Sequence, residues 1–328
     1  MTAEKIFDNI YKITVPLPHT PLKSLNAYVV RGERNLLIDT GFNHAACESA
    51  LMQGLSELGA ELENTDIFIT HLHSDHSGLA WKLQRPGTKV YISRRDWQYI
   101  DVDVMEKIWR RSDAVYEREG FPRLEIDEMP LGTVARSLSP TRNCRFTYIS
   151  DDDILEYGGR KLCVVGAPGH SPGQKCLYDE ESGTMFLGDH ILFDITPTVQ
   201  IWDESGQELE SYMDALRRFR GFNIKNPLPG HRGVSCSVNE RIEQILHHHR
   251  LRLEETVSVV SARPDMTAYE IASHMTWHIR AKSWREFPIT QKWFAVGEIL
   301  AHLRYLEHRG TILRYEEDGL ARYVKAGH

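Results

Sequence analysis

The sequence predicts a layered α/β domain followed by a second, mainly helical domain. Residues 1–236 alternate short apolar strands with helical segments, which is the order typical of sheets covered by helices. Residues 237–328 contain helical patterns and then a hairpin, and 328 residues are enough for two domains. No run approaches the roughly 20 apolar residues that a bilayer requires, so we expect no membrane partner.

The first domain consists mainly of short strands with one clear helix near its start. Helical spacing runs from Ala45 to Leu58 and ends at Gly59. A second helix is expected at 211–221. The strands are short apolar or alternating runs between turn residues, predicted at 10–16, 27–30, 35–39, 66–70, 90–92, 145–149, 161–165, 176–178 and 184–187.

Residues 94–145 interrupt this pattern. Residues 103–119 have helical spacing and many charges, whereas 121–140 is irregular and contains three prolines. We interpret the segment as an insertion with a helical part that lies over one face. Two interpretations remain open, a surface elaboration and a lid over a site.

We place a domain boundary near residue 236. Ser237 to Glu240 and Thr267 to Glu270 both have the Ser/Thr-x-x-Glu form of a capping box, which begins a helix. A third helix follows Pro288, and Asp318-Gly319 predicts the turn of a hairpin. The apolar residues of that third helix are Phe294, Ile299, Leu303 and Leu306. Three helices and a hairpin form the order of a winged helix.

Charge and cysteine content narrow the function classes. The net charge is −7. Residues 237–328 carry 13 Lys and Arg against 12 Asp and Glu, so this part neither demands nor forbids a nucleic-acid partner. The five cysteines are few, odd in number and widely spaced, which favours a reducing compartment and hence a cytoplasmic location. The N-terminal residues show no basic stretch followed by an apolar one, so we expect no signal peptide.

The strongest motif is His71-Leu72-His73-Ser74-Asp75-His76, directly after a predicted strand. In an extended segment, residues two apart face the same way, so His71 and His73 can bind one ion. Asp75 and His76 lie on the turn beyond and can reach a second ion close by. Imidazole and carboxylate ligands without thiolate suit Zn, with Fe or Mn as alternatives.

Three further residues share the position of this motif. His170 and Asp189 each follow a predicted strand, His231 lies in the turn 229–233, and all three have glycine or proline neighbours. Each alone is compatible with an ordinary turn. Their common position at strand ends predicts a single site.

These residues resemble the metallo-β-lactamase-fold hydrolase superfamily, including glyoxalase II. Residues 237–328 resemble the winged-helix tail of some members, including the β-lactamase-like protein 2 group. The first resemblance rests on the His-x-His-x-Asp-His element, the three later residues and Ile38-Asp39-Thr40-Gly41, and it covers about residues 10–235. It implies a four-layer αβ/βα sandwich with two divalent metal ions at one edge. By this resemblance, His71, His73 and His170 bind the first ion, Asp75, His76 and His231 bind the second, Asp189 bridges both, and Asp39 orients the histidine loop. Flavin-linked di-iron oxygen reductases have Glu where His73 stands, which argues against a redox role.

The implied chemistry is hydrolysis by a hydroxide that bridges the two ions. We expect a small-molecule substrate with a thioester, ester or lactone bond, and Asp75 could also transfer a proton. One alternative is a metal-dependent phosphodiesterase or ribonuclease, and another is a catalytically silent winged-helix regulator. Glu316, Glu317 and Asp318 at the tip of the hairpin disfavour nucleic acid without excluding it. A packing, dimerising or pocket-closing role is therefore favoured for residues 237–328, which leaves a homodimer open.

Two other histidine features receive no ligand role. His190 follows Asp189 and is interpreted as facing the pocket or packing in the core. Residues 247–249 are three consecutive histidines within a helix, where neighbours point apart and cannot all bind one ion. We expect one or two of them to be buried against the sandwich.

Overall fold

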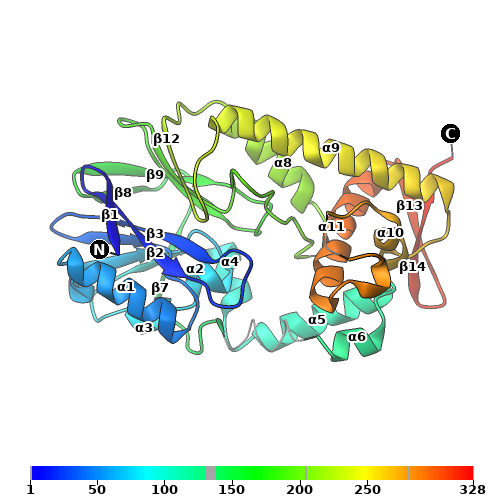
Figure 1. Ribbon diagram of the computed structural model, residues 1–328, viewed down its shortest axis with the longest axis horizontal. Helices are drawn as coiled ribbons and strands as arrows, with labels where there is room; N and C mark the ends of the chain where they lie inside the picture. The colour runs from blue at the N-terminus through cyan, green and yellow to red at the C-terminus, as the bar shows by residue number, and fades with distance from the viewer. Residues whose placement is uncertain (1, 130–137, 204, 279–280, 328) are drawn as a thin grey trace.

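Two β-sheets packed face to face form the centre of the N-terminal part of the protein (Figure 1). The computed structural model describes residues 2–129, 138–203, 205–278 and 281–327. Apolar residues of both sheets share one buried core, in which the rings of Tyr28 and Phe186 lie 5.5 Å apart, edge to face. Helices cover the outer face of each sheet. This confirms the predicted fold class, a four-layer αβ/βα sandwich.

The first sheet has seven strands in sequence order. Strands β1 to β4 pair antiparallel, and pairing is parallel from β4 to β7. The carboxyl ends of the parallel strands therefore meet at one edge, where binding sites of α/β proteins typically lie. The strands are β1 (Ala3–Phe7), β2 (Ile10–Pro16), β3 (Ser24–Val30), β4 (Asn35–Ile38), β5 (Thr65–Phe68), β6 (Val90–Ser93) and β7 (Phe146–Ile149).

The second sheet has five strands in the order β12-β11-β10-β9-β8. All neighbours are antiparallel except β11 and β12, which run parallel and so end together. The strands are β8 (Ile154–Tyr157), β9 (Arg160–Gly166), β10 (Lys175–Asp179), β11 (Thr184–Gly188) and β12 (Asn226–Pro229).

Helices cover both sheets closely. On the first sheet, α1 (Ala45–Glu57) begins where the ring of His44 accepts a hydrogen bond from the backbone of Ala46. Gly54 allows this helix to approach the sheet, because a Cβ there would lie 2.7 Å from the side chain of Ile13. The other covering elements are η1 (Leu62–Asn64), α2 (Ser74–Ser77) and α3 (Ala80–Leu83) on the first sheet, and α8 (Glu208–Phe219) and α9 (Val238–Ala262) on the second.

The segment between β6 and β7 divides between two neighbours. Its first helix, α4 (Arg94–Ile100), packs on the core of the first sheet. The next two, α5 (Met105–Arg118) and α6 (Arg123–Asp127), pack instead on the C-terminal helices (Figure 1). The rings of Tyr116 and Trp293 stack 3.5 Å apart, and Lys292 forms an ion pair with Glu125 at 2.9 Å. The expected helical insertion is thus present, but much of it lies against the C-terminal part rather than over a face of the sandwich.

The C-terminal part continues from the long helix α9. Its elements are α10 (Ala268–His274), η2 (Trp284–Glu286), α11 (Ile289–His308), β13 (Ile312–Glu317) and β14 (Leu320–Lys325). Thr267 and Glu270 form the complete capping box, whereas Ser237 caps α9 by its side chain alone. On α11, the predicted apolar residues Ile299, Leu303 and Leu306 are buried. The prediction was wrong for Phe294, which is 41% exposed, whereas its neighbour Trp293 is buried.

The remaining differences from the sequence prediction concern short elements. Edge strands β1, β8 and β12 were missed. In β1 and β8 polar and apolar residues do not alternate along the sequence, and β12 contains two prolines, which argue against a strand. The helix α6 lies within 121–140, which was expected to be irregular, and residues 130–137 of that stretch lie outside the described part. Within the described residues, no helix combines the length and the apolar character needed to cross a membrane.

Candidate metal centre

The predicted ligands lie at the edge where strands of both sheets end. The His71–His76 loop follows β5, and His170 lies in the turn between β9 and β10. Asp189 follows β11 and His231 follows β12, so the parallel pairing of these strands brings the two side chains to the same edge. All seven predicted side chains are buried or nearly so.

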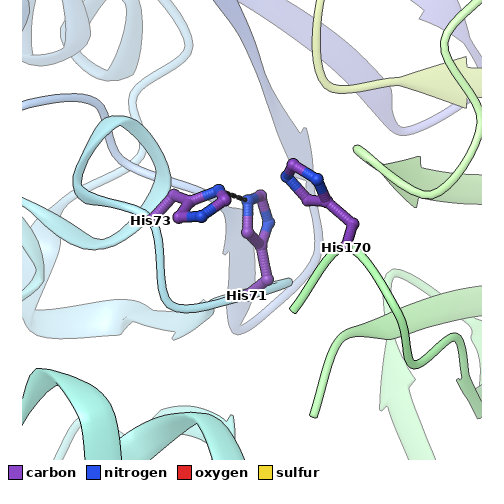
Figure 2. Close-up of side chains that lie close together, drawn as sticks. All are labelled: His71, His73 and His170. Atoms are coloured by element: carbon purple, nitrogen blue, oxygen red, sulfur yellow. Dashed lines mark hydrogen bonds between the residues drawn. The ribbon is translucent and has the colours of Figure 1, made fainter. Parts of the chain in front are cut away.

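His71, His73 and His170 form what we call the first group. One ring nitrogen from each lies within 4.8 Å of the others. Nε2 of His71 is 3.0 Å from Nδ1 of His73, and the three rings face one another in Figure 2. Three imidazoles in this arrangement are a common ligand set for zinc.

Asp75, His76 and His231 form the second group, again with ligand atoms within 4.8 Å of one another. The Nε2 atoms of His76 and His231 are 3.3 Å apart. Nε2 of His231 lies 3.4 Å from Oδ2 of Asp75.

Asp189 lies between the two groups. Its Oδ1 is 3.4 Å from Nε2 of His76, and its Oδ2 is 3.4 Å from Nε2 of His231. The same Oδ2 lies 3.8 Å from Nε2 of His170, which belongs to the first group. One carboxylate thus reaches both groups, as a bridging ligand must.

The donor set fits divalent metal ions. Among the described residues, fifteen buried side-chain nitrogen and oxygen atoms have no hydrogen-bond partner, and two of them, Nε2 of His170 and Oδ1 of Asp189, lie where the two groups meet. Buried polar atoms are rarely left unpaired, so these two atoms point to a missing partner at the convergence of the two groups. Nitrogen and carboxylate donors without a thiolate match zinc, iron or manganese.

Fixed partners orient three of the rings through the nitrogen that faces away from the centre. Nδ1 of His170 donates to the carbonyl of Thr198 at 2.7 Å, and Nδ1 of His231 donates to the carbonyl of Ser24 at 2.8 Å. Nδ1 of His76 lies 2.7 Å from Oδ2 of Asp39. Each contact leaves Nε2 directed at the centre, which is the usual arrangement around metal-binding histidines.

Asp39 also holds the start of the histidine loop. Its Oδ1 accepts from the backbone of Thr70 at 2.8 Å, and its Oδ2 accepts from the hydroxyl of Thr70 at 2.8 Å. Asp39 therefore lies where an orienting residue should be.

The two groups differ in electrostatics. Burial and the neighbouring imidazoles lower the pKa of His71 well below its ordinary value, and burial lowers the pKa of His73 to about 3. Burial also lowers the pKa of His170. The first group is therefore composed of neutral rings, the form that binds metal.

In the second group, carboxylates reverse this effect. Burial alone would lower the pKa of His231, but Asp189 and Asp75 raise it to about 10. Burial likewise opposes a high pKa in His76, and Asp39, Asp189 and Asp75 hold it well above its ordinary value. Burial of Asp75 and Asp189 would raise the pKa of each carboxyl. The neighbouring histidines outweigh this effect and lower the pKa of Asp75 to about 2 and that of Asp189 well below its ordinary value.

Sequence reasoning missed two residues beside the ligands. Asp96, at the start of α4, is fully buried and contacts both the His71–His76 loop and the His170 turn. Trp202 donates from Nε1 to the carbonyl of His170 at 3.2 Å, and its ring lies 5.8 Å from that of His73. Ser93 and Asp96 have the spacing of residues that begin a helix. That spacing predicts a helix N-cap and gives no indication that Asp96 lies beside a metal site.

The other histidines considered from the sequence lie away from the centre. His190 is buried and packs on Phe219, and burial lowers its pKa to about 3. His247 is exposed, His248 is half-buried and His249 is buried. For His190, these contacts agree with the second of the two interpretations, in which the ring packs in the core.

Comparison with known families gives two matches. The family described as the Metallo-beta-lactamase superfamily matches residues 21–231. The family described as Metallo-beta-lactamase-like, C-terminal domain, matches residues 253–326.

Individual proteins are similar over much of the chain. The probable metallo-hydrolase YqjP of Bacillus subtilis is 25% identical over 318 residues, covering 94% of this chain and 96% of that protein. The acyl-coenzyme A thioesterase MBLAC2 of Bos taurus is 28% identical, covering 63% of this chain and 72% of its own. The atrochrysone carboxyl ACP thioesterase of Aspergillus fumigatus is 24% identical, covering 74% of this chain and 46% of its own.

A solved structure has the same overall fold. The metallo-beta-lactamase family protein TTHA1429 from Thermus thermophilus has a TM-score of 0.81 and 27% sequence identity. The match covers 98% of this chain and 100% of that protein, so the resemblance includes the C-terminal part.

Proposed function

We propose that the protein binds two metal ions and cleaves small thioesters. The premise is that the chain belongs to the metallo-beta-lactamase superfamily and is a metal-dependent hydrolase. Esters and lactones share the acyl carbon that such a centre attacks and are the next candidates. The observation that carries the proposal is the position of Asp189, whose two oxygens reach both groups of ligands. The thioester class is supported by the printed activities of two relatives.

We assign the first ion to the first group, the second ion to the second group, and the bridging position to Asp189. Zinc is the metal we expect from this donor set, with iron or manganese as alternatives. Two such ions supply a nucleophile at neutral pH and polarise the oxygen of the scissile bond.

The protein's own residues supply orientation and a proton-transfer group. Asp39, Thr198 and Ser24 fix the rings of His76, His170 and His231, so little rearrangement is needed when ligands bind. For proton transfer we retain Asp75, because its side chain is 12% exposed and that of Asp189 only 8%.

We infer that residues 237–328 form a winged-helix-like domain that closes the site rather than binding nucleic acid. The loop that orients His170 passes beside α11, where a Cβ at Gly297 would lie 3.0 Å from Gln200. Ile201 packs against the C-terminal core, and Trp202 follows beside His73. On the hairpin, Arg314 is engaged by Glu119, which leaves fewer cations for phosphate. We also propose a cytoplasmic location, on the cysteine content.

The test combines metal analysis with a substrate panel. We expect purified protein to contain two equivalents of metal and to hydrolyse acyl-coenzyme A thioesters faster than esters, lactones, a phosphodiester or RNA. Treatment with a chelator should remove the activity, and added zinc should restore it. Asp189→Asn should lose turnover, whereas the exposed-site control His247→Gln should retain it. Phosphodiester or RNA cleavage as the faster reaction would instead support the phosphodiesterase alternative.

A further inference from the structure

A buried carboxylate outside the ligand set joins the two loops that carry the first group. Asp96 is 0% exposed and begins the helix α4 after β6. Its Oδ2 accepts from the backbone of Leu72 at 2.9 Å and from the hydroxyl of Ser171 at 2.6 Å. Its Oδ1 accepts from the backbone of Gly173 at 2.5 Å.

These three donors are neighbours of the three histidines of the first group. Leu72 lies between His71 and His73 in the chain, and Ser171 directly follows His170. Asp96 therefore fixes the backbone from which each ring of the first group projects. It touches none of the rings themselves.

The contact with the His170 turn requires a close approach. A Cβ at position 173 would lie 2.9 Å from Oδ1 of Asp96 and closer still to the hydroxyl of Ser93. Only glycine leaves room for the backbone N–H to reach the carboxylate at this distance. The turn and the start of α4 are thus shaped to fit each other.

A carboxylate at this position is costly for folding, because burial of a charge is unfavourable unless hydrogen bonds compensate. Three donors compensate Asp96, and all three come from the two ligand-bearing loops. Asp39 has the matching position for the second group, where it contacts His76 and the start of the loop. Asp39 also reaches the first group indirectly, because the hydroxyl of Thr70 that donates to it lies 3.1 Å from Nδ1 of His71. The hydrogen bonds of the Asp96 carboxylate, in contrast, run to the backbone and hydroxyl next to the first group.

We propose that Asp96 is a positioning residue that sets the metal affinity of the first group, independently of the second. This rests on the proposed function in one respect, namely that the two groups bind separate ions. Loss of Asp96 should weaken one of two binding steps by about 10- to 100-fold, the range typical for partners behind metal ligands.

The experiment measures zinc binding to stripped protein by competition with a chelator, without reference to turnover. In Asp96→Asn, an amide NH₂ replaces one oxygen and meets a backbone N–H or the Ser171 hydroxyl. We expect one binding step to weaken about 10- to 100-fold and the other to stay unchanged. Ser171→Ala, which removes one donor and keeps the carboxylate, should weaken the same step by a smaller factor.

Background variants identify which step is affected. The variant His231→Ala disables the second group, so its remaining zinc ion is bound by the first group. Because Asp96 acts through the first group, adding Asp96→Asn to this variant should weaken the binding of that ion. In His73→Ala, the remaining ion is bound by the second group, and adding Asp96→Asn should leave its affinity unchanged. Equal weakening in both backgrounds, or in neither, overturns the proposal.

Asp66→Asn is the matched control for loss of a buried carboxylate. Asp66 is 1% exposed and is bound by Arg34 and the backbone of Lys89, away from the ligand loops. We expect its replacement to lower thermal stability and to leave both binding steps unchanged. Selective weakening of one zinc step in this variant would overturn the assignment to Asp96.

Failure of the proposed function has a different signature. Wild-type protein that binds two ions and cleaves no acyl substrate contradicts the function and leaves the Asp96 measurement fully readable. Wild-type protein that binds no ion overturns both.

Discussion

Among the described residues, buried histidines lie next to one another in two places, and only one of these has the features of a metal centre. The first is the pair of ligand groups at the edge of the sandwich. The second, which we call the seam pair, is His249 on α9 and His302 on α11, where Nδ1 of His249 lies 3.2 Å from Nε2 of His302. All groups of three potential metal ligands found among the described residues lie at the first place.

The difference lies in what surrounds the rings. At the metal centre, partners on the outer side direct free nitrogens inward, and Asp75 and Asp189 join them. At the seam the two rings bond to each other, and Nδ1 of His302 donates to the carbonyl of Glu298 at 2.7 Å. Burial lowers the pKa of both seam histidines, so we treat them as neutral packing residues. Nε2 of His249 also has no hydrogen-bond partner, so a free nitrogen alone does not distinguish the two places. Clustered histidines thus indicate a metal site only when carboxylates converge with them, as Asp75 and Asp189 do.

The largest expected effect is at the bridging carboxylate. Asp189→Ala should abolish metal-dependent turnover with the fold intact, and the loss in kcat/KM should exceed the roughly 100-fold typical of outer partners. His73→Ala should behave in the same way. Metal content, circular dichroism and steady-state kinetics measure this. Undiminished activity with full metal loading in both variants would contradict it.

Deletion of residues 237–328 should have the next largest effect. The deletion removes both helices of the seam, α9 and α11, and uncovers Tyr116, Phe121 and Ile126, which pack on the C-terminal core in the intact protein. We expect aggregation and loss of small-substrate turnover, measured by size-exclusion chromatography and kinetics. A soluble truncated protein that keeps these rates and loses only RNA binding would reverse the interpretation of this domain.

Asp39→Asn should have a smaller effect, which falls mainly on the second group because His76 is the only ring that Asp39 contacts directly among the hydrogen bonds of the described residues. The amide keeps the shape of the side chain but weakens the contact with His76, and we expect about 10- to 100-fold weaker binding of one zinc ion. Competition titration measures this, with Asp96→Asn as the counterpart for the other ion. If Asp39→Asn weakened zinc binding equally in the His73→Ala and His231→Ala backgrounds, this would argue against Asp39 and Asp96 supporting different groups.

The seam should respond to pH rather than to metal. Because burial lowers the folded-state pKa of His249 and His302 below the ordinary 6.5, the unfolded chain binds more protons as the pH falls. Stability conferred by the neutral seam is therefore present above pH 6.5 and is lost progressively below it. We therefore expect the free energy of unfolding to be lower at pH 5.5 than at pH 7.5.

Denaturant titrations at pH 7.5 and 5.5 measure this loss. The double variant His249→Gln and His302→Gln should be less dependent on pH than the wild type and should still bind two ions. A pH dependence equal to that of the wild type would show that the seam does not titrate on unfolding.

The smallest effect is expected at the neighbouring exposed histidine. His247 lies on the same helix as His249 but is exposed to solvent. The substitution His247→Gln should therefore change the free energy of unfolding by less than about 0.5 kcal/mol. Metal content and turnover should equal those of the wild type. A loss of metal here would mean that the seam and its surroundings take part in binding after all.

Local patterns accounted for most of what the sequence could predict. The motif from His71 to His76 places four side chains by spacing alone, and Asp318-Gly319 gives the hairpin turn, with φ of 51° and 77°. His170 and Asp189 were predicted because each follows a predicted strand, and His231 was predicted from its proline and glycine neighbours, since the strand before it was missed. Whether ions bind there, and in the assigned groups, stays a prediction.

Contacts between distant segments could not be predicted in this way. Asp96 reads as an ordinary helix start, and its partners follow from the packing of α4 against two loops. Trp202 gains its place beside His73 only through the fold of the preceding loop. The attachment of α5 to α11 depends on matching surfaces, and single-sequence periodicity shows only that α5 has an apolar face.

The stack of Tyr116 on Trp293 has a consequence for how the chain is made. The hydroxyl of Tyr116 contacts the backbone of a residue 177 positions later. At synthesis rates of about 5–20 residues per second, α5 leaves the ribosome on the order of ten seconds or more before its partner exists. During that interval its apolar face has nothing native to cover it, which makes this helix the part of the nascent chain where we expect chaperones to bind.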